Sequence, residues 1–232
     1  MTQGSRSLRA VKMLRSLNTN SIARIEQMCG WQKYTANQSI ISFQDTSTNV
    51  LILIEGHARI IIYSPDGKVV SFRDIGPGEM FGEFAAIDQA PRSASIEALD
   101  TCTIASIPGE TFRNLLMDEP TLMMELLHHL VAEVRGLTNR VYEFSALAVR
   151  NRIQAELLRL AKENTHETGS ILIRPAPTHS EIASRISTHR EAVSREISRL
   201  NKMGLIERVG RDIRILDFSR LEELVHKATG ED

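Results

Sequence analysis

The sequence predicts an α+β fold in which a small N-terminal β-roll or barrel is followed by a long helix and by a helix-turn-helix with a β-hairpin wing. Three observations predict this order: short β-branched runs between turn signals over 40–108, apolar residues at helical spacing from 117, and two short helical patterns before a hairpin pattern over 178–215. We expect two domains, residues 1–146, in which the long helix spans about 118–146, and residues 147–232.

The composition is that of an ordinary globular chain, with 42% hydrophobic and 25% charged residues among 232. Because the net charge is only −1, a nucleic-acid partner would have to be bound by a local patch. Cys29 and Cys102 lack the spacing of a disulfide framework or metal site, and no run approaches the ~18 apolar residues of a membrane span. We expect a cytoplasmic protein that binds neither metal nor membrane, and no catalytic constellation indicates an enzyme.

The β-roll prediction rests on apolar runs that turn signals interrupt. The run "VLILIEGHARIIIY" breaks at Glu55-Gly56, and further turn signals follow at "SPDGK", 64–68, and "GPGE", 76–79. This spacing is typical of short antiparallel strands.

The long helix carries a regular apolar seam with alternating steps of four and three. Its members are Met123, Leu127, Leu130, Val134, Leu137, Val141 and Phe144. A single amphipathic surface helix would also satisfy this pattern, but a rhythm without drift favours a coiled-coil pair. The sequence therefore predicts a homodimer formed through this helix.

The C-terminal third predicts a DNA-reading unit. The segment "ENTHETGSILIRPAPTH", 163–179, has the composition of a connection with one short strand. Capping boxes are predicted at Thr178 with Glu181 and at Thr188 with Glu191, and the second helix ends at Gly204. The following "LIERVGRDIRIL" turns near Gly210, so we predict a helix-turn-helix with a wing.

The segment "FGEFAAIDQAPRSASI", 81–96, combines small residues with two opposite charges. Small residues let backbone N–H groups at a helix start approach a phosphate, and Arg92 supplies charge and forked donors, with Ser93 as a further hydroxyl donor. Glu83 would repel phosphate but accept hydrogen bonds from a sugar hydroxyl. The pair predicts a phosphorylated sugar, although a glutamate and an arginine nine residues apart can also be a surface ion pair.

The whole 81–96 segment resembles the phosphate-binding cassette of cyclic-nucleotide-binding domains, found in bacterial catabolite-activator proteins and in cyclic-nucleotide-dependent kinase subunits. Over nearly its whole length the chain resembles transcription regulators of the catabolite-activator (CRP/FNR) family. The resemblance implies a double-stranded β-helix (jelly-roll), a long dimerisation helix and a winged helix-turn-helix. It assigns the ribose hydroxyl to the Gly-Glu pair and the cyclic phosphate to the arginine and nearby amides. The implied contacts are Gly82, Glu83, Phe84, Ala85, Arg92, Ser93 and Ala94.

The family reads the purine with a pair of hydroxyl residues on the long helix. The resemblance assigns the second position to Thr138, whereas Leu137 occupies the first and Asn139 is a candidate replacement. Thr138 and Asn139 could instead be only polar flank residues. cAMP is the favoured effector and cGMP the alternative, since Ser93 could reach the amino group of a syn guanine.

The second short helix has residues suited to reading guanine and cytosine. Arg190, Glu191 and Arg195 have an R-E-x-x-x-R spacing that resembles the family's reading face, which implies a TGTGA palindrome. Glu191 could alternatively serve only as a cap. Residues 171–215 contain nine Lys/Arg and five Asp/Glu, the expected local patch. The implied DNA contacts are Thr178, His179, His189, Arg190, Glu191, Ser194, Arg195, Arg199 and Lys202.

The resulting expectation is a bacterial regulator that binds a cyclic mononucleotide and then, as a dimer, double-stranded DNA, with RNA polymerase as an implied further partner. One alternative is a relative that responds to another signal or binds DNA without a ligand. An iron–sulfur sensor would need an N-terminal cysteine cluster, and only Cys29 is present. A haem sensor would need a pair of axial ligands, and the sequence shows no such pair. His128 and His129 point about 100° apart on a helix, so they do not chelate one metal. The other alternative is an enzyme or channel module that borrows the nucleotide domain.

Overall fold

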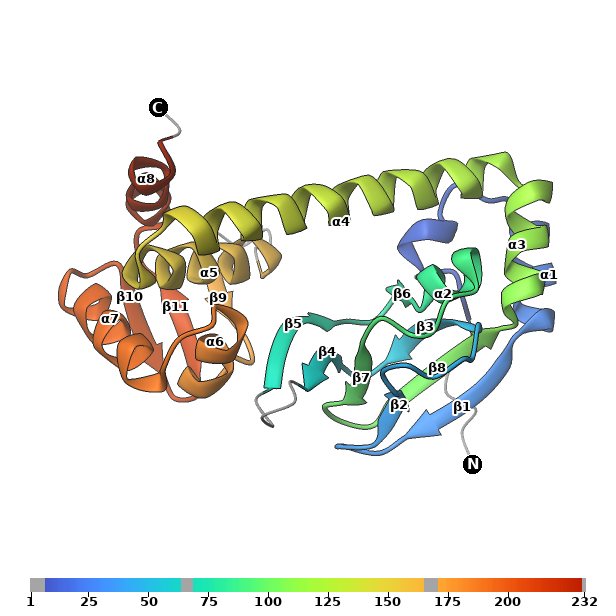
Figure 1. The fold of residues 1–232 in the computed structure, drawn as a ribbon, viewed down its shortest axis with the longest axis horizontal. Helices are drawn as coiled ribbons and strands as arrows, with labels where there is room; N and C mark the ends of the chain where they lie inside the picture. Colours follow the sequence, from blue (N-terminus) through green and yellow to red (C-terminus); the bar gives the residue numbers. More distant parts are fainter. Residues whose placement is uncertain (1–6, 64–68, 165–170, 231–232) are drawn as a thin grey trace. The chain divides into compact units, whose positions relative to one another are not determined.

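The computed structural model describes residues 7–63, 69–164 and 171–230 (Figure 1). The chain divides into two compact units, one up to Glu133 and one from Val134. The predicted turn at 64–68 and the 165–170 part of the predicted connection lie outside the described residues.

The first unit is a roll of two antiparallel four-stranded sheets, with strand orders β1-β8-β3-β6 and β2-β7-β4-β5 (Figure 1). This confirms the β-roll prediction, although the first strand begins ten residues earlier than expected. The strands are β1 (Gly30–Tyr34), β2 (Ser39–Ile41), β3 (Val50–Glu55), β4 (Ala58–Tyr63), β5 (Val69–Ile75), β6 (Met80–Phe81), β7 (Ser95–Ala98) and β8 (Cys102–Ile107).

Helices precede and follow the roll in sequence, and one short helix, α2, lies between β6 and β7. They are the 3₁₀ turn η1 (Lys12–Leu14), α1 (Thr19–Met28), α2 (Glu83–Asp88), α3 (Gly109–Asp118) and α4 (Pro120–Ala146). One apolar cluster packs α1, α3 and the start of α4 against β3 and β8, with Ile25, Phe112 and Leu122 fully buried. A second cluster, which includes Leu53 and Ile104, fills the roll. The segment that joins β6 to β7 is therefore anchored at both ends to strands of this packed roll.

The long helix α4 exists as predicted, but its exposed apolar seam is shifted. Met123 and Leu130 pack against the core of the first unit, because this part of α4 also covers the roll. The side chains exposed instead follow steps of three and four: Met124, Leu127, Val131, Val134, Thr138 and Val141, with Leu137 and Phe144 beside them. Two of the seven predicted seam residues are thus half-buried against the core of their own protomer.

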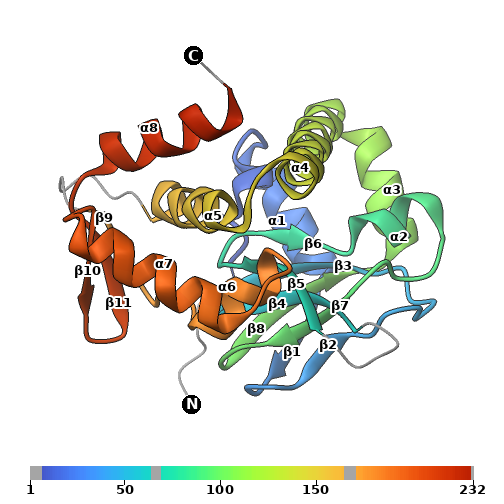
Figure 2. The same cartoon turned by 60° about the vertical axis from the view of Figure 1, so that its left-hand side comes forward.

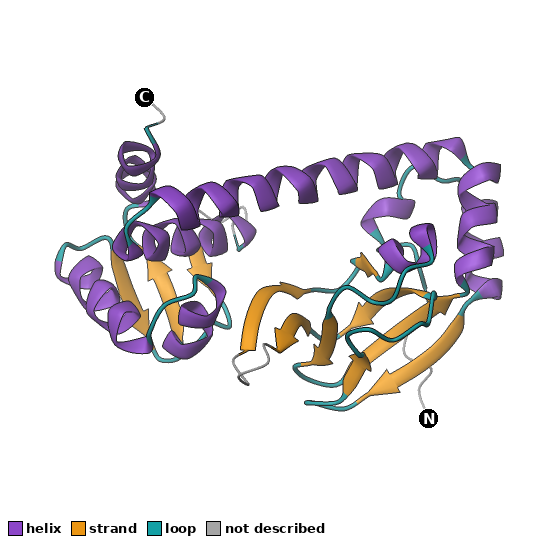
Figure 3. Ribbon diagram, in the orientation of Figure 1, coloured by secondary structure: helices purple, strands orange, loops and turns teal. Residues whose placement is uncertain are grey.

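The second unit is a winged helix-turn-helix, as predicted (Figure 3). A three-stranded antiparallel sheet, β10-β11-β9, packs against helices whose buried residues include Ile153, Ile182, Val193 and Leu200. Its elements are α5 (Val149–Glu163), β9 (Ile171–Ile173), α6 (His179–Arg185), α7 (Arg190–Lys202), β10 (Ile206–Val209), β11 (Asp212–Ile215) and α8 (Phe218–Thr229).

Helix α8 is an addition that the sequence patterns did not predict. It lies beside α5 (Figure 2), where Val225 packs against Ala155 and Leu158. Asp217 caps its first turn by accepting a hydrogen bond from the Arg220 backbone.

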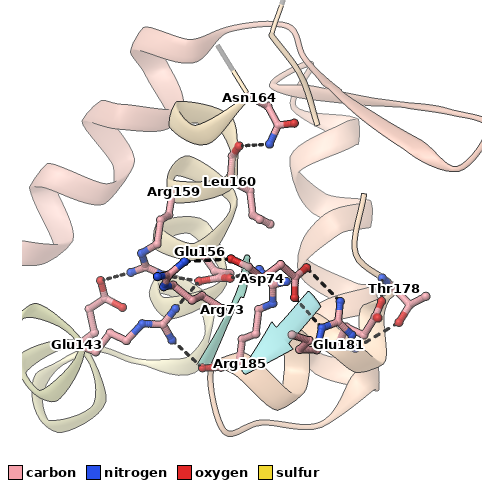
Figure 4. Close-up of polar contacts among 12 residues, drawn as sticks. Arg73, Asp74, Glu143, Glu156, Arg159, Leu160, Asn164, Thr178, Glu181 and Arg185 are labelled. Atoms are coloured by element: carbon pink, nitrogen blue, oxygen red, sulfur yellow. Dashed lines mark hydrogen bonds and ion pairs between the residues drawn. The ribbon is translucent and has the colours of Figure 1, made fainter. Parts of the chain in front are cut away.

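Of the two predicted capping boxes, the first is confirmed and the second is wrong. Thr178 and Glu181 exchange both bonds of the box at the start of α6 (Figure 4). Helix α7 instead begins at Arg190, after His189, which makes no side-chain cap bond. The Thr188 N–H donates to the Ala183 carbonyl at 2.9 Å, so Thr188 belongs to the interhelical turn.

Among the described residues, no helix is long and apolar enough to cross a membrane.

Candidate functional site

The 81–96 segment forms the turn from β6 into α2 and the return to β7. Gly82 precedes α2 with φ at 80°, a left-handed conformation that disfavours any side chain. A Cβ at this position would lie 2.6 Å from Arg92 Nη1. Both backbone conformation and close approach therefore require the glycine that the motif predicted.

Arg92 is buried, with 3% of its surface exposed, and its guanidinium joins this segment to the 43–49 loop. Nε donates to Ser47 Oγ at 3.2 Å, Nη1 to the Gly82 carbonyl at 2.8 Å, and Nη2 to the Asn49 carbonyl at 2.8 Å. Burial lowers the pKa of Arg92, an effect that Asp45 and Glu83 oppose. Because a guanidinium has five N–H donors, one remains on each Nη for an incoming anion.

Sequence reasoning missed Ser47 and Asn49. They lie in a loop more than 40 residues before Arg92 and carry no local motif, so only the closed roll brings them to the guanidinium.

Glu83, at the start of α2, is 7% exposed and faces α4. Its Oε1 lies 3.8 Å from His129 Nε2. Arg73 on β5 pairs with Glu79 at 2.6 Å and with Glu133 at 3.6 Å. These five residues make one charged cluster, here called the sugar-side cluster, of which only Glu83 was predicted as a site residue.

The sugar-side cluster shifts the titration of His129. The neighbouring Glu83 carboxylate raises the pKa of His129, and Glu133 adds to this, whereas burial and Arg73 oppose it. Among the described residues, no three His, Cys, Asp or Glu side chains are grouped to hold a metal ion.

The remaining predicted effector residues differ in exposure. Ala85 is buried in α2 and Phe84 is 44% exposed, while Ser93 is exposed and Ala94 half-buried after Arg92. Thr138 and Asn139 are exposed on the part of α4 that belongs to the second unit. Thr138 Oγ1 donates to the Val134 carbonyl at 2.9 Å, which leaves its oxygen as an acceptor. Their base contacts stay a prediction.

Helix α7 presents a polar outer face and an apolar inner face. Val193, Ile197 and Leu200 are buried in the core of the second unit. A groove on the outer face is lined by Ser194, Arg195, Ser198, Arg199 and Lys202. The predicted contacts His189, Arg190 and Glu191 are exposed at the start of the helix. The fold thus presents the predicted reading residues on one exposed helix.

Arg199 is strongly engaged within the protein. Its Nε and Nη2 donate to both carboxylate oxygens of Glu196, at 2.8 and 2.7 Å. Glu196 also accepts from Gln154 Nε2 at 2.7 Å. Arg199 therefore has fewer N–H donors available for DNA, and its charge is partly neutralised by Glu196.

His179 follows the cap residue Thr178 at the start of α6. Burial lowers the pKa of His179, and the charges of Arg208 and Arg190 lower it further. The imidazole is therefore biased towards the neutral form in the free protein.

A buried carboxylate joins three helices of the second unit (Figure 4). Glu156 on α5 is 1% exposed and pairs with Arg159 on its own helix, with Arg185 of α6 at 3.3 Å and with Arg140 of α4 at 3.6 Å. Arg159 also pairs with Glu143 of α4 at 2.7 Å. The network ties the end of α4 to the first helix of the helix-turn-helix.

Comparison with known proteins gives two family matches. Residues 31–119 match the cyclic nucleotide-binding domain, and residues 151–224 match the Crp-like helix-turn-helix domain.

Two curated relatives cover most of the chain. A CRP-like cAMP-activated global transcriptional regulator of Mycobacterium tuberculosis is 24% identical over 210 residues, which are 90% of this chain and 94% of the relative. The cAMP-activated global transcriptional regulator CRP of Haemophilus influenzae is 28% identical over 186 residues, 80% of this chain and 83% of the relative.

Among solved structures, the c-di-GMP responsive global regulator CLP of Xanthomonas campestris has a TM-score of 0.71 at 21% identity. That match covers 85% of this chain and 99% of CLP, and it shows the shared fold.

Proposed function

We propose that this chain binds a cyclic mononucleotide in its first unit and then, as a homodimer, a palindromic operator. The chain belongs to the CRP/FNR family of non-enzymatic, DNA-binding transcription regulators. The cyclic nucleotide-binding and Crp-like helix-turn-helix matches support the two halves of this activity. The observation that carries it is the buried Arg92, which donates to the Gly82 carbonyl at the start of α2, where Glu83 is the first helical residue.

The effector contacts divide between phosphate and sugar. The two remaining N–H donors of Arg92 hold the cyclic phosphate, together with backbone N–H groups near Gly82. The Glu83 carboxylate accepts from the ribose hydroxyl. cAMP is favoured, since both curated relatives carry cAMP activation in their names, and cGMP is the alternative.

A second candidate is DNA binding without a cyclic mononucleotide. The guanidinium of Arg92 already donates to two protein carbonyls and one hydroxyl, so the protein satisfies much of its hydrogen-bonding capacity. The likeness to a c-di-GMP responsive regulator also supports a different effector.

The dimer forms through the exposed seam of α4. Leu127, Val134 and Val141 recur every seven residues, as a coiled-coil core requires. Thr138 lies four residues after Val134 and three before Val141, so it is on the same face of α4. Dimer formation then places its hydroxyl near the seam, where it reads the purine.

DNA is read by the start of α7 in the major groove. Arg190 and Arg195 are exposed to reach guanine O6 and N7, and Glu191 to accept from cytosine N4, on a TGTGA palindrome. The absence of a capping box at Thr188 in the described structure supports base reading by Glu191. The two reading helices of the dimer then lie about one DNA turn, ~34 Å, apart.

Effector binding shifts the dimer towards this DNA-competent arrangement. The regulator acts in the bacterial cytoplasm, with RNA polymerase as a further partner of the bound dimer.

Gel shifts on a TGTGA palindrome, without ligand and with cAMP or cGMP, test the proposal. Tight, operator-specific binding that needs one of the nucleotides is expected. Glu191→Ala should relax discrimination at one base pair by ~1–3 kcal/mol, whereas Lys202→Ala should weaken binding to all sequences alike. Specific binding that is unchanged by both nucleotides would instead establish the second candidate.

A further inference from the structure

Glu83 combines two demands that conflict in a buried site. To accept from a sugar hydroxyl its carboxylate must be ionised and fixed, yet it is 7% exposed and lies near the position proposed for an anionic phosphate. A buried carboxylate needs a compensating cation. The ion-pair partner that α4 supplies is His129, with Nε2 3.8 Å from Glu83 Oε1.

The charges that face His129 come from three other positions in the sugar-side cluster. Glu83 faces it from α2, Glu133 from one turn further along α4, and Arg73 from β5, while Glu79 pairs with Arg73. With His129 neutral, three carboxylates outnumber the one arginine by two charges. Protonation of His129 halves this excess.

We propose that His129 is a further effector-site residue, which holds Glu83 in place when protonated and thereby makes the affinity for an anionic cyclic nucleotide fall as pH rises. This inference rests on the proposed function. A neutral His129 leaves Glu83 without its α4 cation and increases the negative potential that the phosphate meets. A protonated His129 fixes the carboxylate and reduces this repulsion.

The direction of the pH effect follows from linkage. The pKa of His129 is raised above its ordinary value of 6.5 in the folded protein, so its stabilising charge is complete below pH 6.5 and is lost as pH rises through the raised value. An anion bound nearby raises the pKa of His129 again, so binding takes up protons. A rise of one unit in the pKa of His129 on binding corresponds to about a tenfold change in affinity, or about 1.4 kcal/mol.

The test is calorimetric titration of the full-length protein with cAMP and cGMP between pH 6 and 8, in buffers of different ionisation enthalpy. Proton uptake and about a tenfold fall in affinity with rising pH are expected for the wild type. His129→Gln should bind weakly with little pH dependence, and His129→Arg should keep high affinity throughout. His128→Gln, on the neighbouring exposed position, should behave as the wild type.

The outcomes separate this inference from the function on which it rests. Nucleotide binding that is independent of pH, or equally dependent on pH in His129→Gln, overturns the role of His129 and leaves the proposed function standing. Failure of every form to bind either nucleotide overturns the proposed function itself.

The pairing with Glu83 is measured without any nucleotide. Glu83→Gln should lower the pKa of His129 in an NMR titration of its imidazole. An unchanged titration would overturn the inference.

Discussion

Replacement of Gly82 by alanine tests the close approach on which the effector site depends. The backbone at Gly82 has φ at 80°, where alanine is disfavoured by about 1–2 kcal/mol. The new methyl group would lie 2.6 Å from Arg92 Nη1, below the 3.4 Å at which ordinary contact begins. The guanidinium must therefore move, although its hydrogen bonds to the Gly82 and Asn49 carbonyls, each 2.8 Å long, hold it in place.

The expected loss has two parts that different measurements separate. Backbone strain should lower the free energy of unfolding of the first unit by about 1–2 kcal/mol. Displacement of Arg92 should weaken a charged hydrogen bond to the ligand phosphate, worth about 1.5–3 kcal/mol, which is a loss of roughly 10- to 150-fold in cyclic-nucleotide affinity. Urea unfolding measures the first part and calorimetric titration the second.

Gly136→Ala is the matched control. Gly136 lies within α4, and a Cβ there would meet nothing within 4 Å, so alanine should stabilise the helix by about 0.5–1 kcal/mol and leave nucleotide affinity unchanged. Gly82→Ala with affinity within twofold of the wild type would refute the assignment of the phosphate to Arg92.

Three further predictions concern the second unit and the dimer. Glu156→Gln removes a carboxylate that three arginines share and should lower the free energy of unfolding, measured in urea, by about 3–5 kcal/mol. The control Glu207→Gln, at the exposed pair with Arg214, should have little effect. Equal losses in the two variants would contradict the network's role. Val134→Glu places a charge in the exposed seam of α4 and should yield monomers in sedimentation experiments. The control Ala132→Glu, away from the seam, should remain dimeric. If both variants are dimers, this interface is ruled out. The pKa of His179 is lowered in the free protein, and a nearby DNA phosphate would raise it, so operator affinity should increase as pH falls from 8 to 6. His179→Gln should reduce this pH dependence. Operator affinity of the wild type that does not change with pH would exclude the contact.

Local signals identified the parts of the fold that a short stretch of chain specifies by itself. The box at Thr178 and Glu181 fixed the start of α6, and the glycine and arginine of the 81–96 segment meet as their motif requires. Both depend on residues close in sequence, whose geometry the backbone of one turn or one cassette determines.

Non-local packing accounts for what the sequence patterns did not show. The apolar rhythm of α4 could not distinguish residues that cover the protomer's own core, such as Met123 and Leu130, from those left exposed. Thr188 has the spacing of a cap, but its N–H is drawn to Ala183 by the interhelical turn. His129 meets Glu83 only because α4 packs over the roll, and no spacing along the chain predicts that pair.

The most direct test of the central claim is the dissociation constant of cAMP for the wild type and for Arg92→Gln, measured by calorimetry with Arg92→Lys as a second variant. The wild type should bind one cyclic nucleotide per chain, and loss of the guanidinium from its buried site should weaken binding by about 100-fold or more. The lysine variant, which keeps the charge but not the fork, should fall between the two. Equal binding by all three proteins, or no binding of cAMP or cGMP to the wild type at millimolar concentration, would contradict the account.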